Sequence, residues 1–196
     1  MVNPVDRIRA DRADARKLDD PNADICHLAL ADRNGKASVR TLVLRSINDN
    51  RFGVFINKTS PKWAILSNDC DYELLVWYPS MQRQYRISGS VEFLDDDIVK
   101  TNWHRRPLGS KYLDYVYGQL GPQSSFIESR ATLLEAVKQI KETWRGKDME
   151  PPDTVAGVEL VAECIEVLDL NREERIHDRQ LYTLVKGTWT SRVLVP

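Results

Sequence analysis

A chain of 196 residues, 42% of them hydrophobic, is long enough to bury the core of one domain or of two small ones, and we expect one. The 28 basic and 29 acidic residues give a net charge of −1, which excludes the strongly basic character of a general nucleic-acid-binding protein. Cys26, Cys70 and Cys164 lack metal or redox spacing, and no stretch suits a membrane span or a signal peptide, so we expect a reduced, cytoplasmic protein.

The N-terminal segment is dominated by charge. Residues 5–18 carry charged side chains at nearly every helical position and few apolar ones. This pattern predicts a helix at the surface or an arm against a partner subunit. We therefore assign residues 1–19 to an N-terminal helical arm and residues 20–196 to a single domain.

A series of strands is predicted after the turn at residues 20–22. Asn34-Gly35 is a typical hairpin tip between two apolar runs. The runs that follow are rich in β-branched and aromatic residues, as strands are. We predict five strands before the first long helix, over residues 25–30, 37–47, 52–57, 72–77 and 84–93.

Ser60-Pro61-Lys62 has the signature of a helix start, with Ser60 as the N-cap and Pro61 at the first helical position. The free amides at such a start can bind an anion, although most Ser-Pro helix starts bind nothing. Lys62 favours the anion site, because a cation in the first turn opposes the helix dipole unless an anion offsets it.

Helices are predicted next, over residues 95–103, 111–118 and 127–144, and three further strands over residues 158–168, 175–182 and 189–195. The last helix has an apolar stripe made of Ile127, Leu133, Leu134, Val137 and Ile140. The whole pattern predicts an antiparallel barrel with helices packed at its ends.

A row of cation-capable side chains lies near the C-terminus. If residues 175–182 form a strand, Arg175, His177 and Arg179 all point to one face. Like charges in register repel unless something negative lies between them, so a phosphate-bearing ligand would satisfy the row. An exposed edge strand that discourages aggregation is the alternative.

Common catalytic motifs are absent from the sequence. It contains no G-x-S-x-G elbow, no Walker loop, no dinucleotide-binding glycine pattern and no His pair at metal-ligand spacing, so we expect no metal. His27 alternates with apolar residues, as a core or interface histidine does, and His104 has the setting of a solvated helix end.

Several short polar segments nevertheless occur in the order and spacing of a known family. Ser60-x-Lys62, the row at 175–179 and four more segments, at 40–45, 82–86, 105–110 and 123–125, resemble the pyridoxine/pyridoxamine 5′-phosphate oxidase family. The resemblance extends over roughly residues 20–196. It implies an FMN-binding split β-barrel, antiparallel with peripheral helices, that forms a homodimer with two flavins at the subunit interface.

The resemblance also implies a set of FMN contacts. Arg and Lys side chains suit the phosphate, and Gln side chains suit the alternating acceptors and donor of the isoalloxazine edge. Arg40 and Arg45 differ by an odd number, so in an unbulged strand they face opposite ways and can serve different groups. The implied contacts are Arg40, Thr41, Leu42, Val43, Phe55, Ile56, Ser60, Lys62, Gln84, Gln123, Ser124 and Arg179.

The implied substrate is a phosphorylated form of vitamin B6. In the family pattern Arg106 and Ser110 clamp its phosphate, Arg45 is a further substrate contact, and Arg175 and His177 lie beside the pyridine ring as the catalytic residues. They would orient the substrate while FMN carries the redox chemistry. The reaction converts pyridoxamine 5′-phosphate or pyridoxine 5′-phosphate to pyridoxal 5′-phosphate, with oxygen as the acceptor.

The chain departs from the family pattern at several places. Arg45 stands where the family has Lys, Asn102 where it has Tyr and Pro61 where it has an Arg at the FMN phosphate. A Trp ahead of Arg175 is missing, and a short Tyr-rich insertion precedes Gln123. Two alternatives therefore stay open: an FMN-dependent oxidoreductase of the same fold on another small substrate, and a non-catalytic module that binds flavin or a B6 phosphate.

Overall fold

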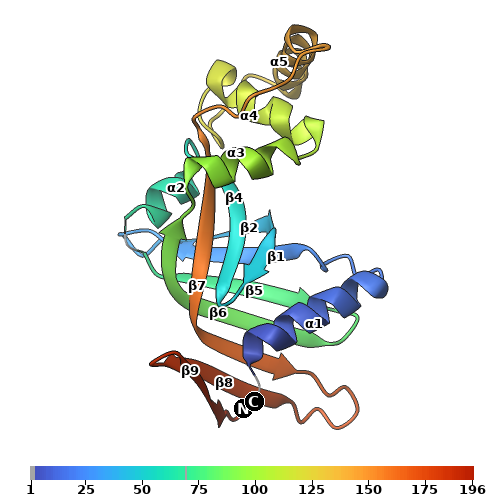
Figure 1. The fold of residues 1–196 in the computed structure, drawn as a ribbon, viewed down its shortest axis with the longest axis vertical. Helices are drawn as coiled ribbons and strands as arrows, with labels where there is room; N and C mark the ends of the chain where they lie inside the picture. The colour runs from blue at the N-terminus through green and yellow to red at the C-terminus, as the bar shows by residue number, and fades with distance from the viewer. Residues whose placement is uncertain (1–2, 69) are drawn as a thin grey trace. The chain divides into compact units, whose positions relative to one another are not determined.

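The computed structural model describes residues 3–68 and 70–196. Within them, nine strands form one antiparallel sheet in the order β2-β1-β5-β6-β7-β4-β3, and β8 and β9 continue it from β7 (Figure 1). The mainly antiparallel β architecture with peripheral helices is confirmed. The strands are β1 (Ile25–Ala31), β2 (Ala37–Val43), β3 (Ser46–Asn48), β4 (Arg51–Asn57), β5 (Tyr72–Tyr78), β6 (Arg83–Phe93), β7 (Val155–Asp169), β8 (Asp178–Val185) and β9 (Thr188–Val193).

Five helices accompany these strands in the described chain: α1 (Pro4–Lys17), α2 (Pro61–Leu66), α3 (Asp96–His104), α4 (Leu108–Leu120) and α5 (Arg130–Thr143). The run at 37–47, predicted as one strand, is two, so six strands rather than five precede the first long helix. The chain divides into two compact units. The first comprises residues up to 54, 69–92 and 159–196, and the second comprises residues 55–68 and 93–158.

In the first unit the strands alternate between a buried and a less buried face. Cys26, Leu28 and Leu30 on β1 are buried, while the residues between them are not. The same alternation holds on β5, because side chains of a strand point to opposite faces in turn. At the hairpin between β1 and β2, Gly35 has a φ of 77°, the left-handed conformation that Gly adopts readily.

Helix α1 packs against this unit. Val5, Ile8 and Ala15 are buried, so the expected surface position is wrong for one face of the helix. On that face Asp11 accepts two hydrogen bonds from Arg83 Nη1 (2.9 and 2.8 Å) and one from the Tyr85 hydroxyl, which ties α1 to β6 (Figure 1). The charge pattern concealed this packing, because part of the charge on the helix is itself buried and paired.

Strands β6 and β7 approach each other very closely at Gly89. A Cβ atom built at residue 89 would lie 2.1 Å from the carbonyl oxygen of Val161 and 2.7 Å from the backbone nitrogen of Glu163. Both of these atoms belong to the backbone, so neither can rotate away. Only glycine fits between the two strands at this position.

The second unit has its own apolar core. Its buried members are Val99, Trp103, Val116, Ala136, Ile140, Met149 and Val155. The predicted stripe of the last helix is partly wrong: Ile127 precedes α5, Leu134 is exposed, and Ala136 is buried instead. Ile140 is buried as predicted, and Leu133 and Val137 pack partly buried against the core.

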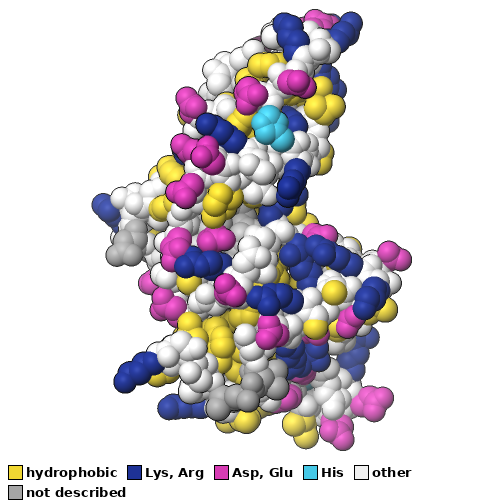
Figure 2. Space-filling model, viewed as in Figure 1, with side chains coloured by type: hydrophobic (Ala, Val, Ile, Leu, Met, Phe, Trp, Pro, Cys, Tyr) yellow, Lys and Arg dark blue, Asp and Glu magenta, His cyan; other side chains and the backbone are white. Residues whose placement is uncertain are grey.

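The surface carries both signs of charge. Figure 2 shows Lys and Arg side chains interspersed with Asp and Glu side chains over the visible face. Among the described residues, no helix combines the length and the apolar character needed to cross a membrane.

Candidate functional site

Predicted ligand-binding residues meet in a hydrogen-bonded network within the second unit. Lys62 Nζ donates to Gln123 Oε1 (3.0 Å), and the backbone N–H of Gln123 donates to Thr59 Oγ1 (3.0 Å). Thr59 Oγ1 donates in turn to Asn57 Oδ1 (2.6 Å). The structure therefore links two of the predicted FMN contacts, Lys62 and Gln123, although 61 positions separate them in the chain.

The same network reaches Arg106 through a buried carboxylate. Asp114 is 6% exposed and hydrogen-bonded to Asn57, and it accepts bonds from Arg106 Nη1 (2.5 Å) and Trp103 Nε1 (2.8 Å). Burial raises the pKa of Asp114, while Arg106 and the hydrogen bonds act in the opposite direction. Arg106, predicted as a substrate-phosphate clamp, is thus half of a desolvated ion pair.

Ser60 occupies the N-cap position of α2, as predicted, but its hydroxyl does not cap the helix. The residue is 2% exposed, and its Oγ has no hydrogen-bond partner among the described residues. A buried hydroxyl without a partner costs free energy, which a bound ligand would recover. This property fits the predicted role of Ser60 as a cofactor contact.

The other predicted contacts of the second unit differ in setting. Ser124 follows Gln123, is exposed and has a φ of 76°. Ile56 on β4 is buried, and Phe55 packs against the core of the unit. Ser110 lies in the first turn of α4, where its backbone N–H donates to the Pro107 carbonyl (3.0 Å).

In the first unit, strand register places Thr41 and Gln84 on one face of the sheet. Thr41 pairs with His27, and His27 pairs with Leu75. The Thr41 hydroxyl lies 3.2 Å from His27 Nδ1. A cavity of about 260 Å³ opens on this face, and His27, Ala29, Val39, Glu73, Leu75, Gln84 and Arg86 line it.

The predicted contacts on β2 do not share one face. Thr41 and Val43 alternate with Arg40 and Leu42, which pair with the buried Leu28 and Cys26. The prediction that Arg40 and Arg45 face opposite ways assumed one unbulged strand, but β2 ends at Val43, so Arg45 lies outside it and the assumption does not apply. The backbone N–H of Arg45 donates to the Gly53 carbonyl at 2.8 Å.

Arg179 on β8 is held by a carboxylate. Its Nε and Nη2 donate to Glu166 Oε1 and Oε2, both at 3.0 Å, in a bidentate pair across β7 and β8. The hydrogen bonds that Arg179 donates to Glu166 raise the pKa of Arg179, so the guanidinium stays charged. Arg86 Nη1 lies 3.5 Å from the same Glu166 carboxylate.

The predicted row of Arg175, His177 and Arg179 is wrong as a strand feature. Strand β8 begins at Asp178, and Arg175 has a φ of 58°, outside the extended region. Arg175 is exposed in the loop, whereas His177 Nδ1 accepts the backbone N–H of Asn171 at 3.1 Å. This hydrogen bond places the proton of neutral His177 on Nε2.

Asp169, at the end of β7 and ahead of Arg175, is held by two arginines. Asp169 accepts a hydrogen bond from Arg7 Nη2 (2.6 Å) and another from Arg83 Nε. These hydrogen bonds connect the end of β7 to α1 and β6.

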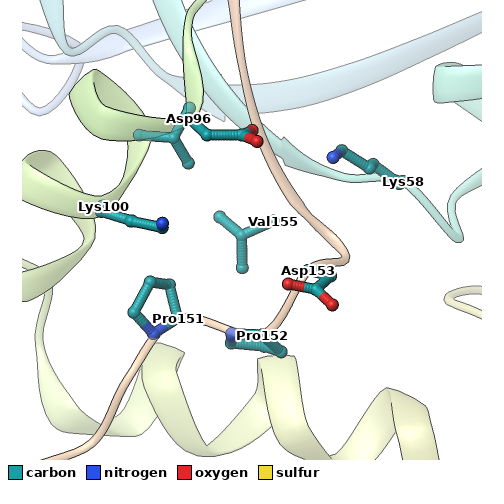
Figure 3. Close-up of a pocket in the computed structure, with 8 residues that line it drawn as sticks. Lys58, Asp96, Lys100, Pro151, Pro152, Asp153 and Val155 are labelled. Atoms are coloured by element: carbon teal, nitrogen blue, oxygen red, sulfur yellow. The ribbon is translucent and has the colours of Figure 1, made fainter.

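One charged cavity was not anticipated from the sequence. It measures about 160 Å³ in the second unit and is lined by Lys58, Asp96, Lys100 and Asp153 over an apolar floor (Figure 3). Two lysines and two aspartates balance in charge, so the lining favours neither anions nor cations.

Sequence reasoning missed Asn57, Thr59, Asp114 and Tyr117, the polar residues that connect the predicted contacts. Tyr117 joins the network because its hydroxyl accepts a bond from Gln123 Nε2 (3.2 Å). Asn57 and Thr59 stand within five positions of Lys62, but small polar residues are common in turns and carry no specific signal. Asp114 lies in the inserted segment, where no motif marks it.

A protein-family model described as pyridoxamine 5′-phosphate oxidase matches residues 18–144. The chain belongs to the pyridoxamine 5′-phosphate oxidase family. A relative named pyridoxine/pyridoxamine 5′-phosphate oxidase from Salinibacter ruber is 31% identical over 99% of this chain and 89% of its own length. Another of that name, from Pseudomonas putida, is 32% identical over 94% of this chain and 84% of its own length.

Solved structures confirm the split-barrel fold. PhzG from Burkholderia lata, in complex with tetrahydrophenazine-1-carboxylic acid, superposes with a TM-score of 0.87 at 21% identity over 99% of this chain and 93% of that chain. A pyridoxamine 5′-phosphate oxidase-related, FMN-binding protein from Nostoc punctiforme gives a TM-score of 0.76 at 20% identity, with full coverage of both chains. Family members are FMN-dependent oxidoreductases as a rule, and the fold of this chain is theirs.

Proposed function

We propose that this protein is an FMN-dependent oxidase that converts pyridoxamine 5′-phosphate or pyridoxine 5′-phosphate to pyridoxal 5′-phosphate with oxygen as the acceptor. The observation that carries the proposal is the network of the second unit. Predicted flavin contacts, Lys62 and Gln123, and a predicted substrate contact, Arg106, belong to one set of hydrogen bonds. Family membership supports the same function.

The residues of the second unit fit the phosphate end of FMN. Lys62 supplies a cation, and the buried Ser60 hydroxyl needs a partner that a phosphate oxygen would provide. Gln123 is held between Lys62, Thr59 and Tyr117, which fixes the orientation of its amide. On the first unit, the further proposed contacts are Arg40, Thr41, Leu42, Val43, Gln84 and Arg179. On the second unit they are Phe55, Ile56 and Ser124.

FMN, when bound, supplies the hydride-accepting chemistry and the reaction with oxygen. The protein binds and orients the substrate. Arg45, Arg106 and Ser110 would hold the anionic group, and Arg175 and His177 would position the ring. His177 can exchange a proton through Nε2, because Nδ1 is fixed by Asn171.

The proposed assembly is a cytoplasmic homodimer with flavin at the subunit interface. The half-exposed face of the sheet in the first unit, with Val39, Val43 and Leu75, is the surface that we assign to the partner subunit. We propose no nucleic-acid or membrane partner.

An FMN-dependent oxidoreductase acting on a different small substrate is the second candidate. It is favoured by the buried pairing of Arg106 with Asp114, which lowers the net positive charge that a phosphate would meet. Arg45 and Asn102, in place of the family's Lys and Tyr, point the same way. PhzG, which shares the fold, was solved with a carboxylic acid rather than a phosphate ester.

A single series on the purified protein tests the proposal. FMN is added, excess is removed by desalting, and the visible spectrum is recorded; pyridoxamine 5′-phosphate is then added and pyridoxal 5′-phosphate is assayed. Retained flavin with product supports the oxidase. Retained flavin without product favours the second candidate, and no retained flavin contradicts both.

A further inference from the structure

The ion pair between Arg106 and Asp114 is unusually well buried for one that lies among proposed substrate contacts. The side chains are 17% and 6% exposed, and the Nε of Arg106 is buried without a hydrogen-bond partner in the described residues. Asp114 is further fixed by Trp103 Nε1 at 2.8 Å. Neither charge can be screened by solvent as a surface pair would be.

A buried pair presents almost no net charge to a ligand nearby. The attraction of Arg106 for an anion is offset by repulsion from Asp114, whose Oδ2 lies 2.5 Å from Arg106 Nη1. The repulsion from Asp114 grows with the charge of the ligand. A phosphate dianion therefore loses more of its attraction to Arg106 than a monoanion or a neutral group does. A lone arginine in the same place would favour the dianion.

We propose that Asp114 determines the charge preference of the substrate site by balancing Arg106, so that the site favours a phosphate dianion over singly charged or neutral ring substrates less strongly than a lone arginine clamp would. This inference rests on the proposed function, because it takes Arg106 to face the anionic end of the substrate. Asp114 acts through Arg106 and is a specificity-determining residue rather than a catalytic one.

Binding of two ligands that differ only in the phosphate tests the proposal. Pyridoxal 5′-phosphate and pyridoxal are titrated into FMN-loaded protein by calorimetry, for the wild type and for Asp114→Asn, which keeps an oxygen that can accept from Trp103. We expect Asp114→Asn to bind pyridoxal 5′-phosphate at least tenfold more tightly and pyridoxal within about twofold of the wild type. Glu135→Gln, an exposed carboxylate of the same unit, is the matched control and should change neither affinity.

The double variant Arg106→Gln/Asp114→Asn distinguishes an effect of charge on ligand binding from an effect on folding. It removes the pair as a whole and leaves no buried charge alone, so it should fold even where Asp114→Asn does not. We expect its affinity for pyridoxal 5′-phosphate to stay within about threefold of the wild type, because the pair has no net charge. A tenfold loss in the double variant, or an unchanged phosphate affinity in Asp114→Asn, overturns the inference.

Turnover of pyridoxamine 5′-phosphate in the same samples distinguishes this inference from the proposed function. A wild type that binds flavin and pyridoxal 5′-phosphate without turnover contradicts the oxidase, while the expected gain in Asp114→Asn still supports the charge preference. Equal losses for both ligands in Asp114→Asn would assign Asp114 a structural role only and overturn the inference. No binding of either ligand to any variant would overturn both proposals.

Discussion

Lys62 and Gln123, two residues of the proposed site, hold each other in a defined orientation. The Lys62 ammonium donates to the Gln123 side chain, which also donates to Tyr117. Each side chain therefore has one defined orientation, so less conformational entropy is lost when a ligand binds. An ammonium can redirect its remaining donors to a phosphate without leaving this contact.

Replacing Lys62 by Ala should weaken FMN binding by about 1.5–3 kcal/mol, the range for a hydrogen bond to a charged group, or roughly 10- to 150-fold. Fluorescence titration of FMN with the apoprotein measures this. Lys138→Ala removes an exposed lysine of the same unit and should leave the affinity unchanged. An unchanged affinity in Lys62→Ala would remove Lys62 from the site.

Arg175 and His177 are expected to serve the substrate and not the cofactor. Ala at either position should lower turnover of the reduced substrate while the protein retains its flavin, because neither residue belongs to the network around Lys62. Steady-state kinetics and the flavin-to-protein absorbance ratio measure both effects. Arg172→Ala alters an arginine of the same loop that bonds Gln82 and should leave turnover intact; loss of flavin in His177→Ala would reassign that residue.

Motif order in the sequence predicted candidate contacts but not the residues that form hydrogen bonds with them. Ser60, Lys62 and Gln123 were predicted from motif order. In the described part of the chain, the Ser60 Oγ is buried without a hydrogen-bond partner, and Lys62 and Gln123 are hydrogen-bonded to each other. Motif order could not predict the role of Asp114, because burial of its carboxylate depends on how α3 and α4 pack and not on its neighbours in sequence. The pairing of Arg179 with Glu166 depends likewise on strand register.

Among the elements, α1 differs most from its predicted role. Its charged residues are not all solvated: Asp11 bonds Arg83 and Tyr85 on β6, and Arg7 bonds Asp169 at the end of β7. Burial, followed by the hydrogen bond to Asp11, raises the pKa of Tyr85, so its phenol stays protonated and donates. The helix therefore contributes polar contacts as well as apolar ones to the first unit.

Asp11→Ala should lower the free energy of unfolding by about 3 kcal/mol, the low end of the range for breaking a buried ion pair, because Arg83 keeps Asp169 as a second partner. Urea denaturation followed by circular dichroism measures it. Asp14→Ala removes an exposed carboxylate of the same helix, paired with Lys17, and should change the stability by about 0.5 kcal/mol or less. Equal effects of the two substitutions would show that the buried contacts of Asp11 do not contribute to the free energy of unfolding.

Strand predictions succeeded where apolar alternation was regular and failed where polar residues dominated. The positions of β1 and β5 were predicted to within about one residue because their buried faces repeat every second residue. Strand β4 was predicted as closely from its apolar and aromatic content, since most of its residues are buried on both faces. The start of β8 was misplaced because Arg175 to His177 have no apolar alternation, and the positive φ of Arg175 cannot be read from its type.

At the scale of the whole molecule, the first unit has a half-exposed sheet face that we propose is covered by a second subunit. Val39, 59% exposed, lies on this face beside a cavity of about 260 Å³. Exposed apolar side chains are unfavourable in contact with water and are well suited to burial in a subunit interface.

Val39→Asp should convert the dimer to a monomer without unfolding it, because the new carboxylate would be buried only in the interface. Sedimentation analysis should give about twice the 22.6 kDa chain mass for the wild type and a single chain mass for the variant. Leu134→Asp, an equally exposed position on α5, is the control and should sediment as the wild type does. A monomeric wild type would contradict the proposed assembly.

The close approach of β6 and β7 at Gly89 limits how the chain can change over evolutionary time. Because the obstacles to a side chain there are the Val161 carbonyl and the Glu163 amide, no substitution of a neighbouring residue could make room for one. A compensating mutation would have to move β6 or β7 as a whole and break the backbone hydrogen bonds that pair it with its neighbouring strands. Position 89 is therefore expected to remain glycine, because no single substitution elsewhere in the chain could accommodate a side chain there.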